Sequence, residues 1–171
     1  MKLAGVVCIL IGAVGYGRDY NLHIRGHYRR LILWKEYLLK MESEMLHLRK
    51  PLPDILFMLG KSAEKPFDAF FKAIYDKLIL YECASPHAIW RETIREFRGE
   101  FGFDREEELL FLDCGRITEQ REDGMLVKET ELFAAQIEFH IERAQKELKD
   151  KLKVSMYLCT TAGIFLILLL I

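Results

Sequence analysis

The chain has 171 residues, of which 51% are hydrophobic and 30% are charged, and its formal net charge is −1. A chain of this length is typical of one ordinary domain. Because binding to nucleic acid needs an excess of basic side chains, the charge balance argues against a nucleic-acid partner. The four cysteines form no C-x-x-C pair, so we expect no disulfide framework and a reducing compartment.

Apart from Lys2, the charged residues lie in the middle of the chain. Every Asp and Glu lies between Asp19 and Asp150, and the stretches on both sides are almost entirely apolar. This segregation divides the chain into an N-terminal membrane segment at 1–17, a water-facing domain at 18–153 and a C-terminal membrane segment at 154–171. The chain is therefore predicted to be an integral membrane protein that binds the lipid bilayer through both ends.

The N-terminal segment leaves two interpretations open. Its apolar run from Leu3 to Gly17 would extend about 23 Å as a helix, which is short for a membrane span. The first interpretation, which we adopt, is an N-terminal transmembrane segment. The second is a cleaved secretory signal, in which Lys2 is the basic start and Ala13-Val14-Gly15 is the cleavage site.

The middle of the chain shows helical periodicity and no strand-like alternation of useful length. A first helix is expected over 23–49, and the proline pair at Pro51 and Pro53 ends it. A shorter helix starts at Pro53 and is expected to break at Gly60-Lys61-Ser62. Their apolar positions are Ile24, Tyr28, Leu31, Trp34, Leu38, Met41, Met45 and Leu48 in the first helix, and Ile55, Leu56 and Leu59 in the second.

Two further helices are expected after prolines. Pro66 opens a helix rich in aromatic residues, which we expect in the core. Ser85 and Pro86 have the residue types of an N-cap and a first helical position, and a break is expected between Gly99 and Gly102. The apolar positions are Phe67, Phe70, Phe71, Ile74, Leu78 and Tyr81 in the first of these helices, and Ile89, Trp90, Ile94 and Phe97 in the second.

The last two helices of the domain complete an all-α fold. Asp104, with Glu107 three residues later, has the form of a capping box, and the final helix is expected from about Met125. The packing residues are Leu109, Leu110 and Leu112 in the first, and Leu126, Thr130, Phe133, Ile137, Ile141, Ala144, Leu148 and Leu152 in the second. The sequence predicts an up-and-down bundle of about six helices.

The C-terminal segment Val154–Ile171 has 18 residues and no charge. As a helix it would be about 27 Å long, close to the roughly 30 Å of the hydrocarbon core. It is predicted to be a C-terminal transmembrane helix that continues the last helix of the domain. The alternative is a buried terminal helix, but no other part of the chain is apolar enough to cover it.

Basic residues cluster on the domain side of both apolar segments. The positive-inside rule places such clusters in the cytoplasm, so the domain is predicted to be cytoplasmic with both termini outside. Arg18, Lys151 and Lys153 are the predicted membrane-anchoring flanks. The clusters are Arg18, Arg25, Arg29, Arg30 and Lys35 after the first segment, and Arg143, Lys146, Lys149, Lys151 and Lys153 before the second.

No motif of catalysis or of nucleotide binding is found. We predict no enzyme activity, no catalytic residue, no cofactor, no metal site and no small-molecule substrate. His23 and His27 are four residues apart, a spacing that can bind a metal, but they lie among cations and are expected to be solvated. Single histidines at His47, His87 and His140, and the acidic helix face of Glu92, Glu96 and Glu100, are expected to be structural or exposed.

Cys114 leaves a choice between a reactive thiol and a small buried residue beside a tight packing point at Gly115. We adopt the second interpretation, because a lone cysteine is more often buried than reactive. A membrane enzyme or metal protein therefore stays a less favoured alternative for the whole chain.

Three stretches together resemble the stage III sporulation protein AB family of endospore-forming bacteria. They are Pro51-Leu-Pro-Asp-Ile55, the Cys114-Gly115 to Glu119-Gln120 region, and the final run from Lys153-Val-Ser-Met-Tyr157 through Gly163 to Ile171. The resemblance covers nearly the whole chain in layout and length.

The resemblance implies a domain similar to the cytoplasmic helical domain of the type II secretion F protein. It also implies a non-enzymatic membrane scaffold of a sporulation channel or secretion-like complex. Such a scaffold would lie in the mother-cell membrane around the forespore, with a secretion-type ATPase and other channel subunits as partners. The alternatives are a generic membrane-anchored interaction module and an exported domain with a cleaved signal peptide.

Overall fold

The computed structural model describes residues 25–81, 84–120 and 122–170, and all of their side chains except those at 152, 155–160 and 162–170. The described residues belong to two compact units. The larger unit is Arg30–Ile141, and the smaller unit contains the described residues before and after it. The predicted N-terminal membrane segment at 1–17 and the flanking Arg18 lie outside the described residues.

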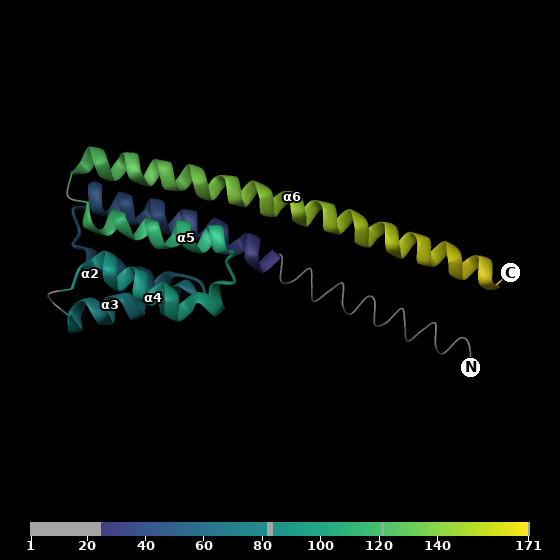
Figure 1. The fold of residues 1–171 in the computed structure, drawn as a ribbon, viewed down its shortest axis with the longest axis horizontal. Coiled ribbons are helices and arrows are strands. Elements are labelled where there is room, and N and C mark those ends of the chain that lie inside the picture. Colours follow the sequence, from purple (N-terminus) through teal and green to yellow (C-terminus); the bar gives the residue numbers. More distant parts are fainter. Residues whose placement is uncertain (1–24, 82–83, 121, 171) are drawn as a thin grey trace. The chain divides into compact units, whose positions relative to one another are not determined.

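Every regular element in the described part of the chain is helical (Figure 1), so the predicted all-α fold class is confirmed. A helix over residues 25–46 comes first. It is followed by α2 (Leu52–Ser62), α3 (Phe67–Leu80), α4 (Pro86–Phe101), α5 (Arg105–Cys114), the 3₁₀ helix η1 (Gly115–Glu119) and α6 (Asp123–Leu170). This agrees with a bundle of about six helices, and η1 is an additional element.

The final helix α6 extends to Leu170 and so includes most of the backbone of the predicted C-terminal segment at 154–171. Among the residues that the structure describes, no helix has both the length and the apolar character needed to cross a membrane. The two membrane segments stay predictions.

The helix at residues 25–46 contacts three other elements of the larger unit. Its Trp34 ring lies 4.7 Å from the ring of Phe111 in α5, and its Tyr37 ring lies 5.6 Å from the ring of Phe71 in α3. On another side, the Nζ atom of Lys35 donates to a carboxylate oxygen of Glu138 in α6 at 2.5 Å. This helix therefore lies at the centre of the unit.

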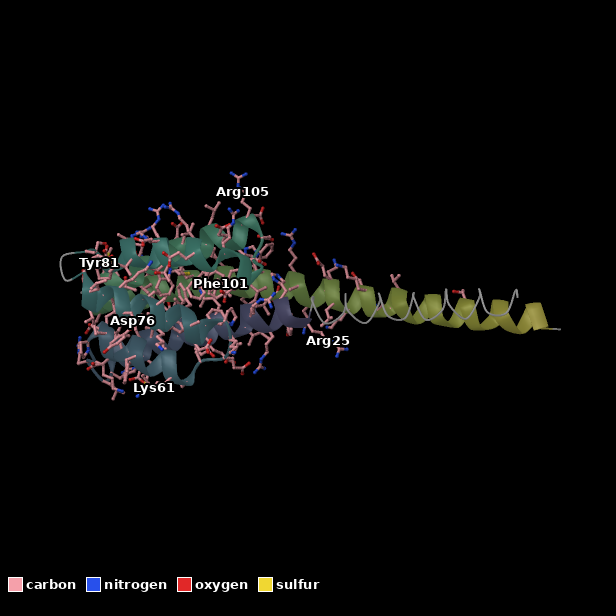
Figure 2. The ribbon with its side chains drawn as sticks, turned by 90° about the horizontal axis from the view of Figure 1, so that it is seen from below. Arg25, Lys61, Asp76, Tyr81, Phe101 and Arg105 are labelled. Atoms are coloured by element: carbon pink, nitrogen blue, oxygen red, sulfur yellow. The ribbon has the colours of Figure 1, made fainter. Side chains whose placement is uncertain are left out.

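An aromatic cluster forms the core between α3, α4 and α5. Phe70 packs against Trp90 with ring centroids 5.0 Å apart, and Phe101 packs against Phe111 at the same separation. Figure 2 shows Phe101 among the inner side chains, whereas Lys61 and Arg105 lie at the surface. The aromatic helix predicted after Pro66 is thus in the core, because Phe67, Phe70 and Phe71 are at most 2% exposed.

The two helix starts for which a side-chain cap is predicted are confirmed. Ser85 caps α4 by accepting a hydrogen bond from the backbone N–H of Ala88. Asp104 and Glu107 form the complete capping box of α5, in which each side chain accepts from the backbone N–H of the other residue. These bonds satisfy N–H groups that a helix start otherwise leaves without partners.

The predicted breaks at Gly60-Lys61-Ser62 and between Gly99 and Gly102 contain the ends of α2 and α4, which lie at Ser62 and Phe101. The first glycine of each break is still helical, because Gly60 lies inside α2 and Gly99 lies inside α4, whose C-cap is Gly102 with a left-handed φ of 60°. A glycine inside a helix costs about 1 kcal/mol relative to alanine but does not end it. At Gly60 there is a packing reason, because a β-carbon there would lie 3.2 Å from the backbone nitrogen of Lys72 in α3.

Three predicted core positions lie at the surface. Leu48 is 59% exposed, Tyr81 is 56% exposed and Leu109 is 55% exposed. Leu48 and Tyr81 lie past the last turn of their helices, so the helical period no longer determines where they point. Leu109 is inside its helix, and it is exposed because it lies on the side of α5 that faces the surface between α5 and α6.

Candidate functional site

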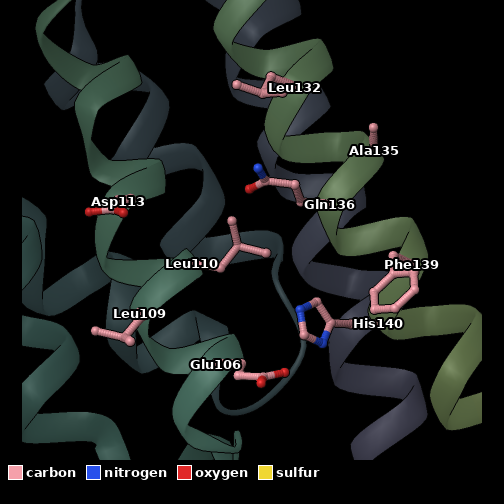
Figure 3. Close-up of a pocket in the computed structure, with 9 residues that line it drawn as sticks. All are labelled: Glu106, Leu109, Leu110, Asp113, Leu132, Ala135, Gln136, Phe139 and His140. Carbon is pink, nitrogen blue, oxygen red and sulfur yellow. The ribbon is translucent and has the colours of Figure 1, made fainter.

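A groove of about 510 Å³ lies between α5 and α6 (Figure 3). Its α5 wall consists of Glu106, Leu109, Leu110 and Asp113, and its α6 wall consists of Leu132, Ala135, Gln136, Phe139 and His140. We call these residues the α5/α6 groove. All of them belong to the larger compact unit.

The walls of the α5/α6 groove carry large apolar side chains that are open to solvent. Leu109 is 55% exposed, Leu132 is 57% exposed and Phe139 is 64% exposed. Single exposed apolar residues are common on protein surfaces, but a contiguous group of them is typical of an interaction site. The groove is therefore the surface at which another protein could contact this bundle.

The sequence of α5 explains why apolar side chains remain on its outer face. Four consecutive residues, 109–112, are apolar, and a helix buries only one side. Phe111 and Leu112 take the buried side, and the carbonyl of Phe111 accepts a hydrogen bond from the indole N–H of Trp90 at 2.9 Å. Leu109 consequently lies in the groove.

The charged residues that line the groove are acidic. Glu106 and Asp113 are both exposed on α5 and are separated by seven residues, or about 10.5 Å along a helix. Neither Lys nor Arg is among the nine lining residues. The groove thus combines apolar walls with a negative α5 rim.

His140 closes one end of the groove, where Figure 3 shows its ring facing Glu106. The ring is buried, and its Nδ1 atom lies 3.7 Å from a carboxylate oxygen of the buried Glu107. Ligand atoms of Asp104, Glu106 and His140 lie within 4.8 Å of one another, close enough to hold a divalent cation. However, both acids are exposed, and Asp104 already caps α5.

A smaller cavity of about 290 Å³ lies between α2 and α3 and is lined by Phe57, Gly60, Lys61, Lys72, Tyr75 and Asp76. Within this lining, the ammonium of Lys61 lies 4.0 Å from the centroid of the Phe57 ring, and the Phe57 and Tyr75 ring centroids are 5.2 Å apart. The exposed ring of Phe57 thus already has a cation–π contact with a residue of the same cavity. The α5/α6 groove is therefore the better candidate for binding a partner protein.

Comparisons with known proteins identify the family. The sequence model of the family described as "Stage III sporulation protein AB" matches residues 2–171. The chain belongs to the stage III sporulation protein AB family. A solved structure titled "Stage III sporulation protein AB (SpoIIIAB)" has the same fold, with a TM-score of 0.65 and 17% identity over 70% of this chain and 94% of that one. No curated protein matches the chain.

Two of the predicted membrane-anchoring flanks of this stage III sporulation protein AB family member are described. Lys151 and Lys153 lie in the part of α6 that belongs to the smaller unit. Lys151 is partly exposed and its Nζ atom lies 3.7 Å from a carboxylate oxygen of Glu147, one turn earlier, whereas Lys153 is exposed. Their role at a membrane stays a prediction.

The histidines of this family member occupy separate places. His47 is exposed, His87 is partly buried and His140 is buried at the groove. His23 lies outside the described residues, so the spacing of His23 and His27 is not tested. Sequence reasoning missed the position of His140, because only the packing of α5 beside α6 brings it near Glu106.

Cys114 is fully buried, as expected for a small residue at a tight packing point. Burial, together with the nearby negative charge of Asp113, raises the pKa of its thiol well above the usual value. The thiol therefore stays protonated at neutral pH, and a protonated thiol is a poor nucleophile.

The acidic face of α4 is a set of exposed carboxylates, as predicted. Glu92 and Glu96 both accept hydrogen bonds from the Nζ atom of Lys77 in α3, at 2.9 and 2.8 Å. They thus join α4 to α3. The sequence spacing revealed the acids, but the matching lysine on another helix gave no local signal.

Proposed function

We propose that the chain is a non-enzymatic membrane scaffold of a sporulation channel or secretion-like complex. Membership of the stage III sporulation protein AB family supports a role in sporulation. The observation that carries the scaffold role is the solvent-open α5/α6 groove, whose apolar residues suit binding to another protein. In this proposal the bundle resembles the cytoplasmic domain of the type II secretion F protein.

The proposed location is the mother-cell membrane around the forespore. The apolar segments 1–17 and 154–171 would enter the lipid bilayer, and the basic flanks Arg18, Lys151 and Lys153 would hold the bundle on the cytoplasmic side. This topology would expose the α5/α6 groove to a secretion-type ATPase or to neighbouring ring subunits. The scaffold positions these partners and carries out no reaction of its own.

Affinity purification of the tagged full-length protein from membranes of sporulating cells tests the partners. The expected result is co-purification of the ATPase or of other channel subunits. Repeated recovery of the protein without any subunit of the complex would overturn the scaffold role.

Accessibility of introduced cysteines tests the topology. Single cysteines at the exposed positions Ala69 and Ala88 should react with a membrane-impermeant reagent only after the mother-cell membrane is opened. Labelling in unbroken cells, or digestion of the bundle by added protease, would place the domain on the wrong side for a cytoplasmic ATPase.

A further inference from the structure

We propose that the α5/α6 groove binds a basic amphipathic helix of a partner protein, with Lys or Arg residues seven positions apart beside its apolar stripe. This inference rests on the proposed function, because it names the kind of segment through which a subunit of the complex would dock. Three properties of the groove lead to it: the spacing of its apolar residues, the sign of its charge and the incompatibility of that charge with other occupants.

The apolar residues of the groove repeat at helical spacing. Leu132 and Phe139 are seven residues apart on α6, with Ala135 and Gln136 between them among the lining residues. They lie opposite Leu109 and Leu110 of α5. Two neighbouring helices with exposed apolar residues two turns apart form a groove that can bind a third helix. The third helix would contact the groove through its apolar residues at positions i, i+3 or i+4, and i+7.

The charge of the groove selects the sequence of that helix. Glu106 and Asp113 lie on the α5 side of the groove, also two turns apart. A docked helix with Lys or Arg at i and i+7 would place one cation near each carboxylate while its apolar residues contact Leu132 and Phe139. Complementary charge of this kind increases both the rate and the specificity of association.

The same charge disfavours two other occupants. A second copy that docked through the same face would bring Glu106 and Asp113 toward their own counterparts, and like charges in an interface reduce affinity. A membrane surface with anionic lipids would be repelled by the acidic rim for the same reason. A basic helix of a different protein is the occupant that both the apolar walls and the acids favour.

Photo-cross-linking in sporulating cells tests the occupant directly. A photoreactive amino acid replaces Ala135, an exposed residue that lines the groove, and in the control it replaces Ala69, which is exposed on α3. We expect a cross-link from position 135 to a helical segment with seven-spaced cations, and none to that segment from position 69. A cross-link from position 135 to another copy of the chain or to an acidic segment, or no protein cross-link there, would overturn the proposal.

Matched substitutions test the contribution of charge. Asp113→Lys reverses the charge at one groove position in the last turn of α5, and Glu100→Lys makes the same reversal in the last turn of α4, outside the groove. We expect Asp113→Lys to reduce the yield of the position-135 cross-link at least about tenfold, and Glu100→Lys to leave it within about twofold. Changing the partner's neighbouring cation to Glu should restore the Asp113→Lys cross-link, and an unchanged yield with Asp113→Lys would reject the charge argument.

A second pair of variants tests the apolar contacts. Leu132→Ser with Phe139→Ser should abolish the cross-link, whereas Ile79→Ser with Leu80→Ser, at similarly exposed positions near the end of α3, should preserve it. Circular dichroism of each purified full-length variant checks that the helices remain. Because the replaced side chains are all more than half exposed, the bundle should fold in every case.

The outcomes separate this inference from the scaffold role. If complex subunits co-purify equally well with the wild type and with Asp113→Lys, the scaffold role stands and the groove is not the docking site. If the wild type recovers no complex subunit but still cross-links from position 135 to a basic helix of another protein, the groove inference stands and the sporulation scaffold fails.

Discussion

The indole ring of Trp90 lies directly against the backbone of Gly115, where a β-carbon would come within 2.6 Å of the indole Cγ atom and 3.0 Å of the Cδ2 atom of His87. Trp90 is only 2% exposed. The close contact positions η1 against α4, and it explains why a residue without a side chain follows Cys114.

Gly115→Ala should therefore destabilise the protein. Adding a methyl group to a packed core typically costs about 1–3 kcal/mol, and here the neighbouring group is a rigid buried ring. Equilibrium urea unfolding of the full-length protein in mild detergent, followed by tryptophan fluorescence, measures this change. The control is Gly99→Ala, where no atom lies within 4 Å of the added carbon, and it should stabilise the protein by about 0.5–1 kcal/mol. Equal stability of the two variants would contradict the packing argument.

The hydrogen bond from Trp90 to the Phe111 carbonyl should also contribute measurably to stability. Trp90→Phe keeps an aromatic ring in the core but leaves the buried carbonyl without its 2.9 Å donor. Loss of one partner of a buried hydrogen bond costs about 1–3 kcal/mol. The same urea experiment, with fluorescence replaced by circular dichroism, measures the loss. Phe97→Leu, at a partly exposed position on the same helix, serves as a control and should have a smaller effect.

Cys114 should resist alkylation while the protein is folded. Its raised pKa means that the reactive thiolate is scarce at pH 8, and the burial of the side chain blocks access. Site-resolved mass spectrometry after iodoacetamide treatment should find position 114 unmodified in native protein and fully modified in urea. Rapid modification of Cys114 without denaturant would revive the interpretation as a reactive thiol.

The pair of Arg49 and Asp123 should make stability depend on pH in the acid range. The terminal nitrogens Nη1 and Nη2 of Arg49 donate to the carboxylate, at 2.7 and 2.6 Å, and this hydrogen bonding lowers the pKa of Asp123 below its ordinary value. A carboxyl with a lowered folded-state pKa stabilises the fold above its unfolded-state pKa and loses that effect as the pH falls through the folded-state pKa.

Thermal unfolding of the wild type and of Asp123→Asn from pH 3 to pH 7 checks this dependence. The wild type should have the higher melting temperature at pH 7, and the difference should shrink as the pH falls below about 4. Because the pair is exposed, added salt should also reduce the difference. A melting-temperature difference that is independent of pH would assign the effect to something other than ionisation.

The helices could be predicted from the sequence wherever local chemistry determines them. The Ser85 cap and the capping box of Asp104 and Glu107 depend on side chains three residues from the groups they bind, so their spacing alone is sufficient. The buried positions Ile55, Leu56 and Leu59 follow from helical periodicity in the same way.

The groove could not be predicted, because it depends on which helices are neighbours. In α5 four consecutive apolar residues hide the period, and only the packing partners determine that Phe111 is buried while Leu109 is exposed. The 3₁₀ helix η1 is too short to show a period. His140 and Glu106 are far apart in sequence, and no local pattern connects them.

The short helix α5 is held in place by specific contacts at both of its ends. The capping box fixes its first turn, and the contact of Gly115 with Trp90 fixes the chain immediately after its last residue. The wall that carries Leu109 and Asp113 therefore needs no ordering when a ligand arrives, and the entropic cost of complex formation falls on the incoming segment. If the bound segment is unstructured when free, substitutions that change the helix propensity of that segment should change its affinity for the groove. Substitutions that stiffen α5 should change this affinity very little.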